Sequence, residues 1–206
     1  MAESKFQIQQ VTDNKEKGVS YKENFERYNQ AKASEFYLEC LWILYAMIED
    51  RTSSFLYYIG FTSEKNRSSA AVTRKIKKEI REILKMEQQD TKYKFHTLFG
   101  KLTRIEELME WCKKDNEATT DYQKALIKAL RPVANLSDFE NILNYLKAEW
   151  CRKRNQLIHS LFNKNPQIVV SELKPLIEKG YNAARILDKS VTQLKKAKIR
   201  ERFKLQ

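Results

Sequence analysis

Residues 138–162 read DFENILNYLKAEWCRKRNQLIHSLF, and this stretch decides the predicted fold class. Ser137 and Glu140 have the spacing of a capping box, so we expect one continuous helix from about Asp138 to Phe162. The segment 163–166, which ends in proline, should terminate it. The apolar residues recur three or four positions apart, as on one buried helix face: Phe139, Ile142, Leu143, Leu146, Trp150, Leu157, Ile158 and Leu161.

The composition extends this helical prediction to the whole chain. Its 206 residues suffice for one substantial hydrophobic core, and a hydrophobic fraction of 42% excludes an intrinsically disordered protein. Only 4 glycines and 3 prolines are present, which is too few for a sheet connected by hairpin turns. We therefore predict an all-α fold built as a helical bundle.

Apolar spacing places the other helices. A helical region is expected from about Tyr21 to Ile59, with Ser34 as a possible cap and Gly60 as its end. Its buried face should carry Leu41, Tyr45, Ile48, Thr52 and Phe55. The residue before a proline disfavours helix, so a short helix starting near residue 122 should end before Pro132. Further helices are expected at 70–86, 95–113 and 171–195.

Composition also divides the chain into three parts. Residues 1–18 are polar and aperiodic, so we expect a flexible N-terminus. Residues 19–195 should form the helical bundle. Residues 196–206 are strongly basic, and we expect them to be a C-terminal tail that frays.

Cysteine usage and hydropathy restrict the environment of the protein. Cys40, Cys112 and Cys151 are far apart and match no metal-ligand spacing, so we expect reduced thiols, no metal and no cofactor. The longest apolar run, residues 41–48, is far too short to span a membrane, and the first residues lack the apolar core of a signal peptide. These features predict a cytoplasmic protein without membrane contact.

The charge of the chain points to a polyanionic partner. The formal net charge is +12, from 39 Lys and Arg against 27 Asp and Glu. RNA is the natural partner for such a protein, although basic residues on helix faces also serve for solvation alone. The candidate RNA-binding residues lie in the helix expected at 70–86 and in the helix expected at 138–162: Arg74, Lys75, Lys77, Lys78, Arg81, Arg152 and Lys153.

The helix expected at 138–162 also contains the candidate catalytic residues Arg154, Asn155 and His159. On a helix, Asn155 and His159 share one face, whereas Arg154 lies about 140° away from His159 around the axis. Cleavage of RNA without a metal requires proton transfers at the ribose 2′-OH and the leaving 5′ oxygen, and these suit a histidine. It also requires stabilisation of a pentavalent phosphate, which suits an arginine.

Arg154, Asn155 and His159, late in a basic all-helical chain, resemble the motif of the HEPN family (higher eukaryotes and prokaryotes nucleotide-binding). Its ribonuclease members carry arginine and histidine separated by four to six residues, commonly with a polar residue straight after the arginine. The resemblance implies four or five core helices with short accessory helices, and a homodimer whose motif helices face each other around a composite active site. The implied activity is metal-independent endoribonuclease cleavage to 2′,3′-cyclic phosphate and 5′-OH ends.

The resemblance also implies a biological role and further site residues. Such a nuclease is expected to be a prokaryotic toxin or antiviral defence effector with a regulatory or antitoxin partner. Members paired with nucleotidyltransferase antitoxins often carry tyrosine two residues after the histidine, where this chain has Leu161, which weakens that particular link. An acid on an early helix often assists, so Glu49 or Asp50 is the candidate. Either acid could instead stay exposed or pair with Arg51.

The motif also has a non-catalytic interpretation. Arg154 could form a salt bridge with an acid of the bundle, and His159 could be a satisfied histidine at an interface. The domain would then be an RNA-binding or protein-interaction module. The basic helix and the basic tail would suffice for that role.

Overall fold

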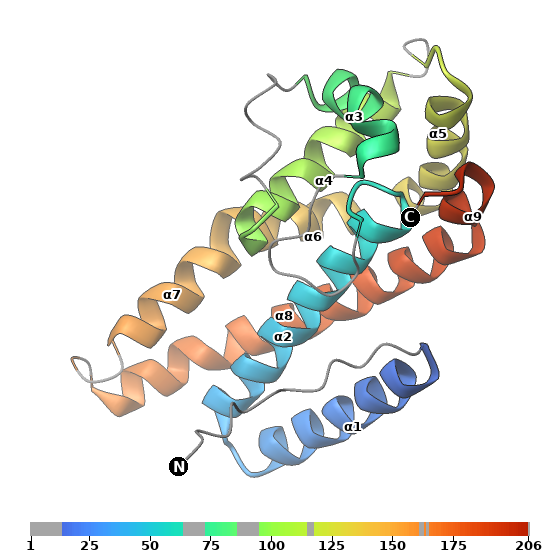
Figure 1. Cartoon of the computed structure of the whole chain (residues 1–206). Helices are drawn as coiled ribbons and strands as arrows, with labels where there is room; N and C mark the ends of the chain where they lie inside the picture. The colour runs from blue at the N-terminus through green and yellow to red at the C-terminus, as the bar shows by residue number, and fades with distance from the viewer. Residues whose placement is uncertain are drawn as a thin grey trace, which may run out of the picture.

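Two long helices, α2 (Tyr37–Tyr58) and α8 (Pro166–Lys196), lie side by side and form the centre of the fold (Figure 1). Every regular element in the described residues is helical, so the predicted all-α class is confirmed. No helix among them is long and apolar enough to cross a membrane. The structure is a computed structural model that describes residues 14–63, 73–85, 95–114, 118–160, 163 and 165–205.

The other helices surround this pair (Figure 1). α1 and α4 contact α2 from different sides, α5 and α6 contact α8, and α9 packs on α5. The elements are α1 (Asn14–Ala33), η1 (Arg74–Ile76), α3 (Lys77–Leu84), α4 (Leu98–Lys113), α5 (Asp121–Ala134), α6 (Phe139–Tyr145), the π-helical segment η4 (Leu146–Trp150), α7 (Cys151–Ser160) and α9 (Ile199–Phe203).

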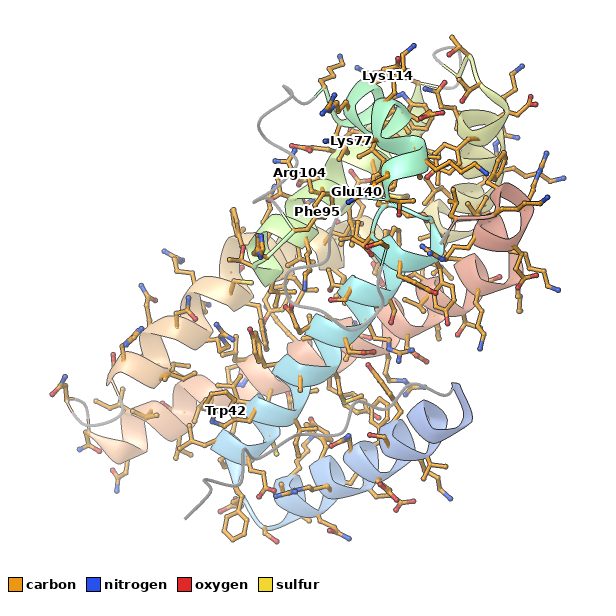
Figure 2. The ribbon with its side chains drawn as sticks, viewed as in Figure 1. Trp42, Lys77, Phe95, Arg104, Lys114 and Glu140 are labelled. Carbon is orange, nitrogen blue, oxygen red and sulfur yellow. The ribbon has the colours of Figure 1, made fainter. Side chains whose placement is uncertain are left out.

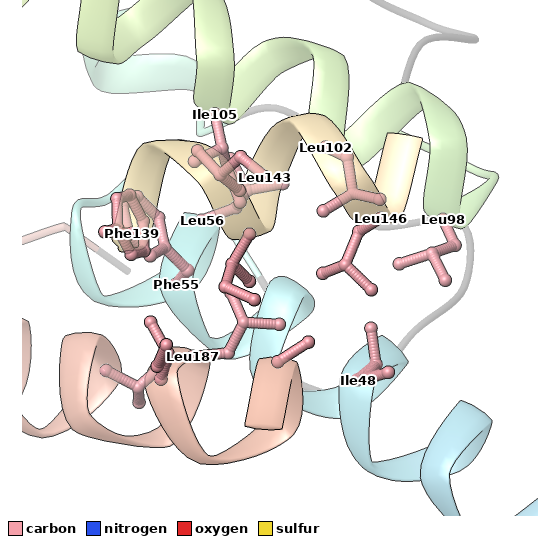
Figure 3. Packing of buried hydrophobic residues seen from close by; sticks show 14 of the residues in the cluster. Ile48, Phe55, Leu56, Leu98, Leu102, Ile105, Phe139, Leu143, Leu146 and Leu187 are labelled. Atoms are coloured by element: carbon pink, nitrogen blue, oxygen red, sulfur yellow. The ribbon is translucent and has the colours of Figure 1, made fainter. Parts of the chain in front are cut away.

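The hydrophobic core lies where α2 passes α4, α6 and α8 (Figure 3). The rings of Phe55 and Phe139 stack there with their centroids 6.0 Å apart. The face of α2 predicted from apolar spacing is confirmed as buried, except that Tyr45 is only half-buried. The same core cluster includes Ile48, Leu56, Leu98, Leu102, Ile105, Leu143, Leu146 and Leu187.

One largely buried arginine connects α1, α2 and α8. Arg51 Nη1 donates to Asp188 Oδ1 at 3.0 Å, and Arg51 Nε donates to the Tyr21 hydroxyl at 2.6 Å. The Tyr21 hydroxyl donates to Asp50 Oδ2 at 3.0 Å, and this carboxylate accepts from Arg51 at 2.9 Å. Because the Arg51 side chain is only 13% exposed, two carboxylates are needed to offset its desolvation. Of the alternatives left open for Asp50, the structure shows the pairing with Arg51.

The helical region expected between Tyr21 and Ile59 consists of two helices. Between α1 and α2 the chain turns at Glu35, which has a left-handed φ of 58°. Ser34 does not cap α2, whose N-cap residue forms no side-chain cap hydrogen bond. α1 begins at Asn14, so the last part of the predicted flexible N-terminus is helical, and residues 1–13 lie outside the described residues.

Two boundaries predicted at prolines are also wrong. α8 begins at Pro166 rather than near Ser171, because the Asn165 side chain accepts from the Gln167 N–H at 2.9 Å and caps the helix. Proline suits the first helical turn, where its missing N–H would have no partner in any case. α5 continues past Pro132, which lies in its last turn.

The prediction that residues 196–206 fray is wrong as far as Leu205. After α8 the chain turns into α9, and the side chains of Ile199 and Leu205 are buried. The Arg200 guanidinium donates to the carbonyl oxygens of Thr62 at 2.8 Å and Leu205 at 2.7 Å. The tail therefore closes one end of the bundle.

The buried Tyr28 should make the fold sensitive to alkaline pH. Burial raises the pKa of Tyr28 to about 12, and its hydroxyl has no hydrogen-bond partner among the described residues. An unfolded tyrosine ionises near pH 10, so Tyr28 stabilises the fold fully below about pH 10 and this contribution is lost as the pH rises towards 12.

We therefore expect Tyr28→Phe to be at least as stable as the wild type at pH 8. Between pH 8 and pH 11 the variant should lose about 1 kcal/mol less stability than the wild type, as measured by urea unfolding. Equal losses in the two proteins would contradict this explanation.

Candidate active site

The predicted motif helix is interrupted by a π-helical turn. η4 separates α6 from α7, and the Cys151 N–H bonds to the carbonyl of Leu146, five residues back instead of four. The capping box predicted at Ser137 does not form, because α6 starts after Asp138, which has a left-handed φ of 65° and no side-chain cap hydrogen bond. π-turns inside helices are uncommon and occur frequently at functional sites.

The π-turn carries Trp150 into the core. This indole is fully buried and stacks on Tyr45 of α2, with centroids 6.4 Å apart and planes 10° apart. On the other side, α8 approaches it at Gly180, where an ideal Cβ would lie 2.8 Å from Trp150 Nε1. The indole therefore holds the start of α7 between α2 and α8.

One turn further on, Arg154 lies against the same aromatic pair. Its guanidinium carbon is 4.0 Å from the Tyr45 ring centroid and 6.0 Å from that of Trp150. Arg154 Nε donates to Asn155 Oδ1 at 3.2 Å, and Nη2 donates to the same oxygen. Among the described residues Arg154 contacts no carboxylate, so the salt bridge of the non-catalytic interpretation is not formed there. A stacked guanidinium still presents its in-plane N–H groups to an anion.

Arg152, Asn155 and His159 form an open face on α7. All three side chains are exposed, and their spacing of three and four residues places them on one side of the helix. Within the described part of the chain His159 makes no hydrogen bond or ion pair. Arg154 points about 140° away from His159 around the helix axis. The cation that shares the face of the histidine is therefore Arg152.

Neither candidate accessory acid pairs with the motif arginine. Lys101 Nζ donates to Glu49 Oε1 and, at 2.8 Å, to Ser53 Oγ. The Lys101 side chain is only 2% exposed, so Glu49 neutralises a buried ammonium group. Its other oxygen, Oε2, has no hydrogen-bond partner among the described residues. Asp50 lies in the network of Arg51.

Cys151 adjoins Arg154 and is not suited to act as a nucleophile. Burial raises the pKa of the Cys151 thiol to about 11, even though the positive charge of Arg154 acts in the opposite direction. The thiolate is the reactive form of cysteine, and almost none of it is present at neutral pH. In the described ranges no group of three His, Cys, Asp or Glu side chains is arranged to hold a metal ion.

The predicted basic helix lies far from this site. The segment 74–81 forms η1 and the start of α3, at the end of the bundle opposite α7 (Figure 1). Two of its cations have local partners: Lys75 Nζ donates to the Phe203 carbonyl at 2.8 Å, and Lys78 lies 3.8 Å from Glu82. The structure thus does not bring these candidate RNA-binding residues next to the open face.

Comparison with known proteins does not assign the chain to a family. No family model matches it, and neither a curated protein nor a solved structure matches it.

Two contacts of the candidate residues were not predicted from the sequence: that of Tyr45 with Arg154 and that of Lys101 with Glu49. Tyr45 was expected only as part of the buried face of α2, and nothing in the local pattern relates it to Arg154. The available signal was the aromatic pair Trp42 and Tyr45, three residues apart and therefore adjacent on one helix face. Lys101 gave no signal, because its neighbours are typical of an ordinary amphipathic helix.

Proposed function

We propose that the protein is a metal-independent endoribonuclease of the HEPN type. The observation that carries this proposal is the open face of α7, where Arg152, Asn155 and His159 lie together beside the stacked Arg154. One rigid helix thus presents a proton-transfer group and two cations that suit phosphate. The formal net charge of +12 favours RNA as the substrate.

The proposed reaction is transesterification within the RNA strand. The 2′ oxygen loses its proton and attacks the adjacent phosphorus, while the bond from phosphorus to the 5′ oxygen breaks and that oxygen takes up a proton. The products are a 2′,3′-cyclic phosphate and a 5′-OH. His159 is the residue for proton transfer, and Arg154 stabilises the charge of the pentavalent phosphate, an effect of roughly 3 kcal/mol for one well-placed donor. Asn155 orients the guanidinium by accepting its N–H groups.

A homodimer is part of the proposal, for a geometric reason. Within one chain the Arg154 and His159 side chains point about 140° apart around α7, so one helix does not aim both at the same phosphate. We place the two chains around a two-fold axis with their α7 helices facing each other. His159 of each chain then lies opposite the helix face of the partner that carries Arg154. The separation of about 140° between these residues then no longer prevents them from acting on one phosphate.

The biological role is proposed from the same resemblance. A nuclease of this kind would be a toxin or an antiviral defence effector in a prokaryotic cytoplasm, restrained by a regulatory or antitoxin partner. A reducing compartment suits the three cysteines, which form no disulfide within the described residues.

Cleavage in the presence of EDTA tests the proposal. Purified protein should cut single-stranded RNA to 2′,3′-cyclic phosphate and 5′-OH ends, identified by mass spectrometry. His159→Ala should lower the rate at least about a hundredfold, because it removes the proton-transfer group. His96→Ala is the matched control, since this half-buried histidine lies outside the motif, and it should cleave normally. Cleavage by His159→Ala at the wild-type rate would refute the assignment.

The open face makes a separate prediction about Arg152. Arg152→Gln should reduce cleavage on the order of tenfold, because this cation shares the face of His159 and reaches the same RNA strand. Lys153, also a candidate RNA-binding residue from the sequence, points away from His159 around the helix and pairs with Glu149 at 3.0 Å, so Lys153→Gln is the control for total charge. Rates would be compared at low and high salt. Equal effects of the two substitutions would show that only total charge matters.

The second candidate function is an RNA-binding module without catalysis. The exposed basic segment at η1 and α3 favours it, because these cations lie far from α7 and need no active site. This function predicts salt-dependent retention of RNA without turnover. Charge reversal at Arg74 and Lys78 would then weaken retention, whereas substitutions at His159 would have no effect.

A further inference from the structure

Trp42 lies exposed on α2 beside the candidate active site. Of the three tryptophans, Trp111 and Trp150 are 6% and 0% exposed, whereas Trp42 is 58% exposed. Figure 2 shows it in the N-terminal half of α2, at the end of the bundle opposite Lys77. The Trp42 indole is therefore open to contact with a ligand.

The exposed indole belongs to a continuous aromatic series. The Trp42 and Tyr45 rings meet at 83° with their centroids 6.5 Å apart, and Tyr45 stacks in turn on the buried Trp150. The Arg154 guanidinium lies 4.0 Å from the centre of the same Tyr45 ring. An exposed aromatic side chain and a cation that suits phosphate therefore contact the same tyrosine.

This pair of features fits one class of ligand better than others. An acidic protein surface would use the cation of Arg154 but not the flat indole, and an apolar surface would use the indole but leave the cation unpaired. An unpaired nucleobase with its phosphate uses both, since bases stack on aromatic side chains and phosphates bind guanidinium groups. Duplex RNA does not expose the faces of its bases.

We propose that Trp42 is a stacking site for an unpaired base of single-stranded RNA, and that Arg154 binds the phosphate attached to that base. The inference rests on the proposed function in that the bound strand is the one presented to His159. Stacking is tolerant of sequence, so the site selects single strands over duplexes without selecting a particular base.

The test uses a strand that cannot be cleaved, a 2′-O-methyl RNA oligonucleotide, and an abasic strand of the same length. Binding would be followed by quenching of tryptophan fluorescence and, independently, by fluorescence anisotropy of a labelled strand. The variants are Trp42→Leu, which keeps an apolar side chain without a ring, and Trp42→Phe, which keeps a smaller ring. Phe36→Leu is the control, because Phe36 is equally exposed but lines a hollow formed with α1.

The wild type should bind the abasic strand about tenfold more weakly than the strand with bases. Trp42→Leu should bind the strand with bases about tenfold more weakly and should largely lose the discrimination between the two strands. Trp42→Phe should lie in between, and Phe36→Leu should behave as wild type. Undiminished binding or undiminished discrimination by Trp42→Leu would overturn the proposal, as would a lack of binding by the wild type.

Two further outcomes separate this inference from the proposed function. Stacking by Trp42 in a protein that never cleaves RNA would refute the nuclease and leave the base site intact. Normal cleavage by Trp42→Leu, with normal binding, would refute the base site alone. Light scattering of Trp42→Leu completes the test, because conversion of a wild-type dimer to a monomer would show that a second copy of the chain covers the indole.

Discussion

The burial of Trp150 between α2 and α8 is the constraint on which the candidate site depends. The indole fits against Tyr45 on one side and Gly180 on the other, and truncation of such a side chain typically costs about 3–5 kcal/mol. Its Nε1 has no hydrogen-bond partner among the described residues, so packing outweighs the cost of one unsatisfied donor. The π-turn is the local adjustment that lets α6 and Trp150 both face the core. α7 starts from this fixed point, and Arg154 therefore reaches the Tyr45 ring.

The cations inside the bundle are neutralised by carboxylates, whereas within the described residues the arginines of α7 are not. Inside, Glu49 neutralises Lys101, and Asp50 and Asp188 neutralise Arg51. Each acid of these networks offsets the desolvation of a specific cation. On α7 the arginines at positions 152 and 154 form no ion pair within the described residues, so their charge is available to an anion. A buried network that stabilises the fold thus leaves a positive surface around His159.

The sequence predicted the helices well and the contacts between them poorly. Apolar spacing identified the buried face of α2, because burial of one stripe is a property of the helix alone. The π-turn was missed because Leu146 and Trp150 are four residues apart, which also fits an ordinary helix. Pro166 was taken as the end of one helix, although proline serves equally in the first turn of the next.

At the candidate site, too, the local pattern was predictable and the contacts between helices were not. Arg154, Asn155 and His159 were found as a local pattern on one helix, and the structure places them on α7. The contact of Arg154 with Tyr45 joins two helices that are far apart in the chain, so no local pattern contains it. The pairing of Glu49 with Lys101 could not be foreseen for the same reason, because Lys101 lies on α4.

In the proposed dimer, Arg154 and His159 act on one phosphate although they point in different directions on one helix. Mixing two inactive proteins, Arg154→Ala and His159→Ala, tests it most directly. In mixed dimers one of the two sites contains both an intact Arg154 and an intact His159 from different chains, so cleavage should return to about a quarter of the wild-type rate. A mixture that stays as inactive as its components, after chain exchange has been verified with differently tagged proteins, would contradict the claim.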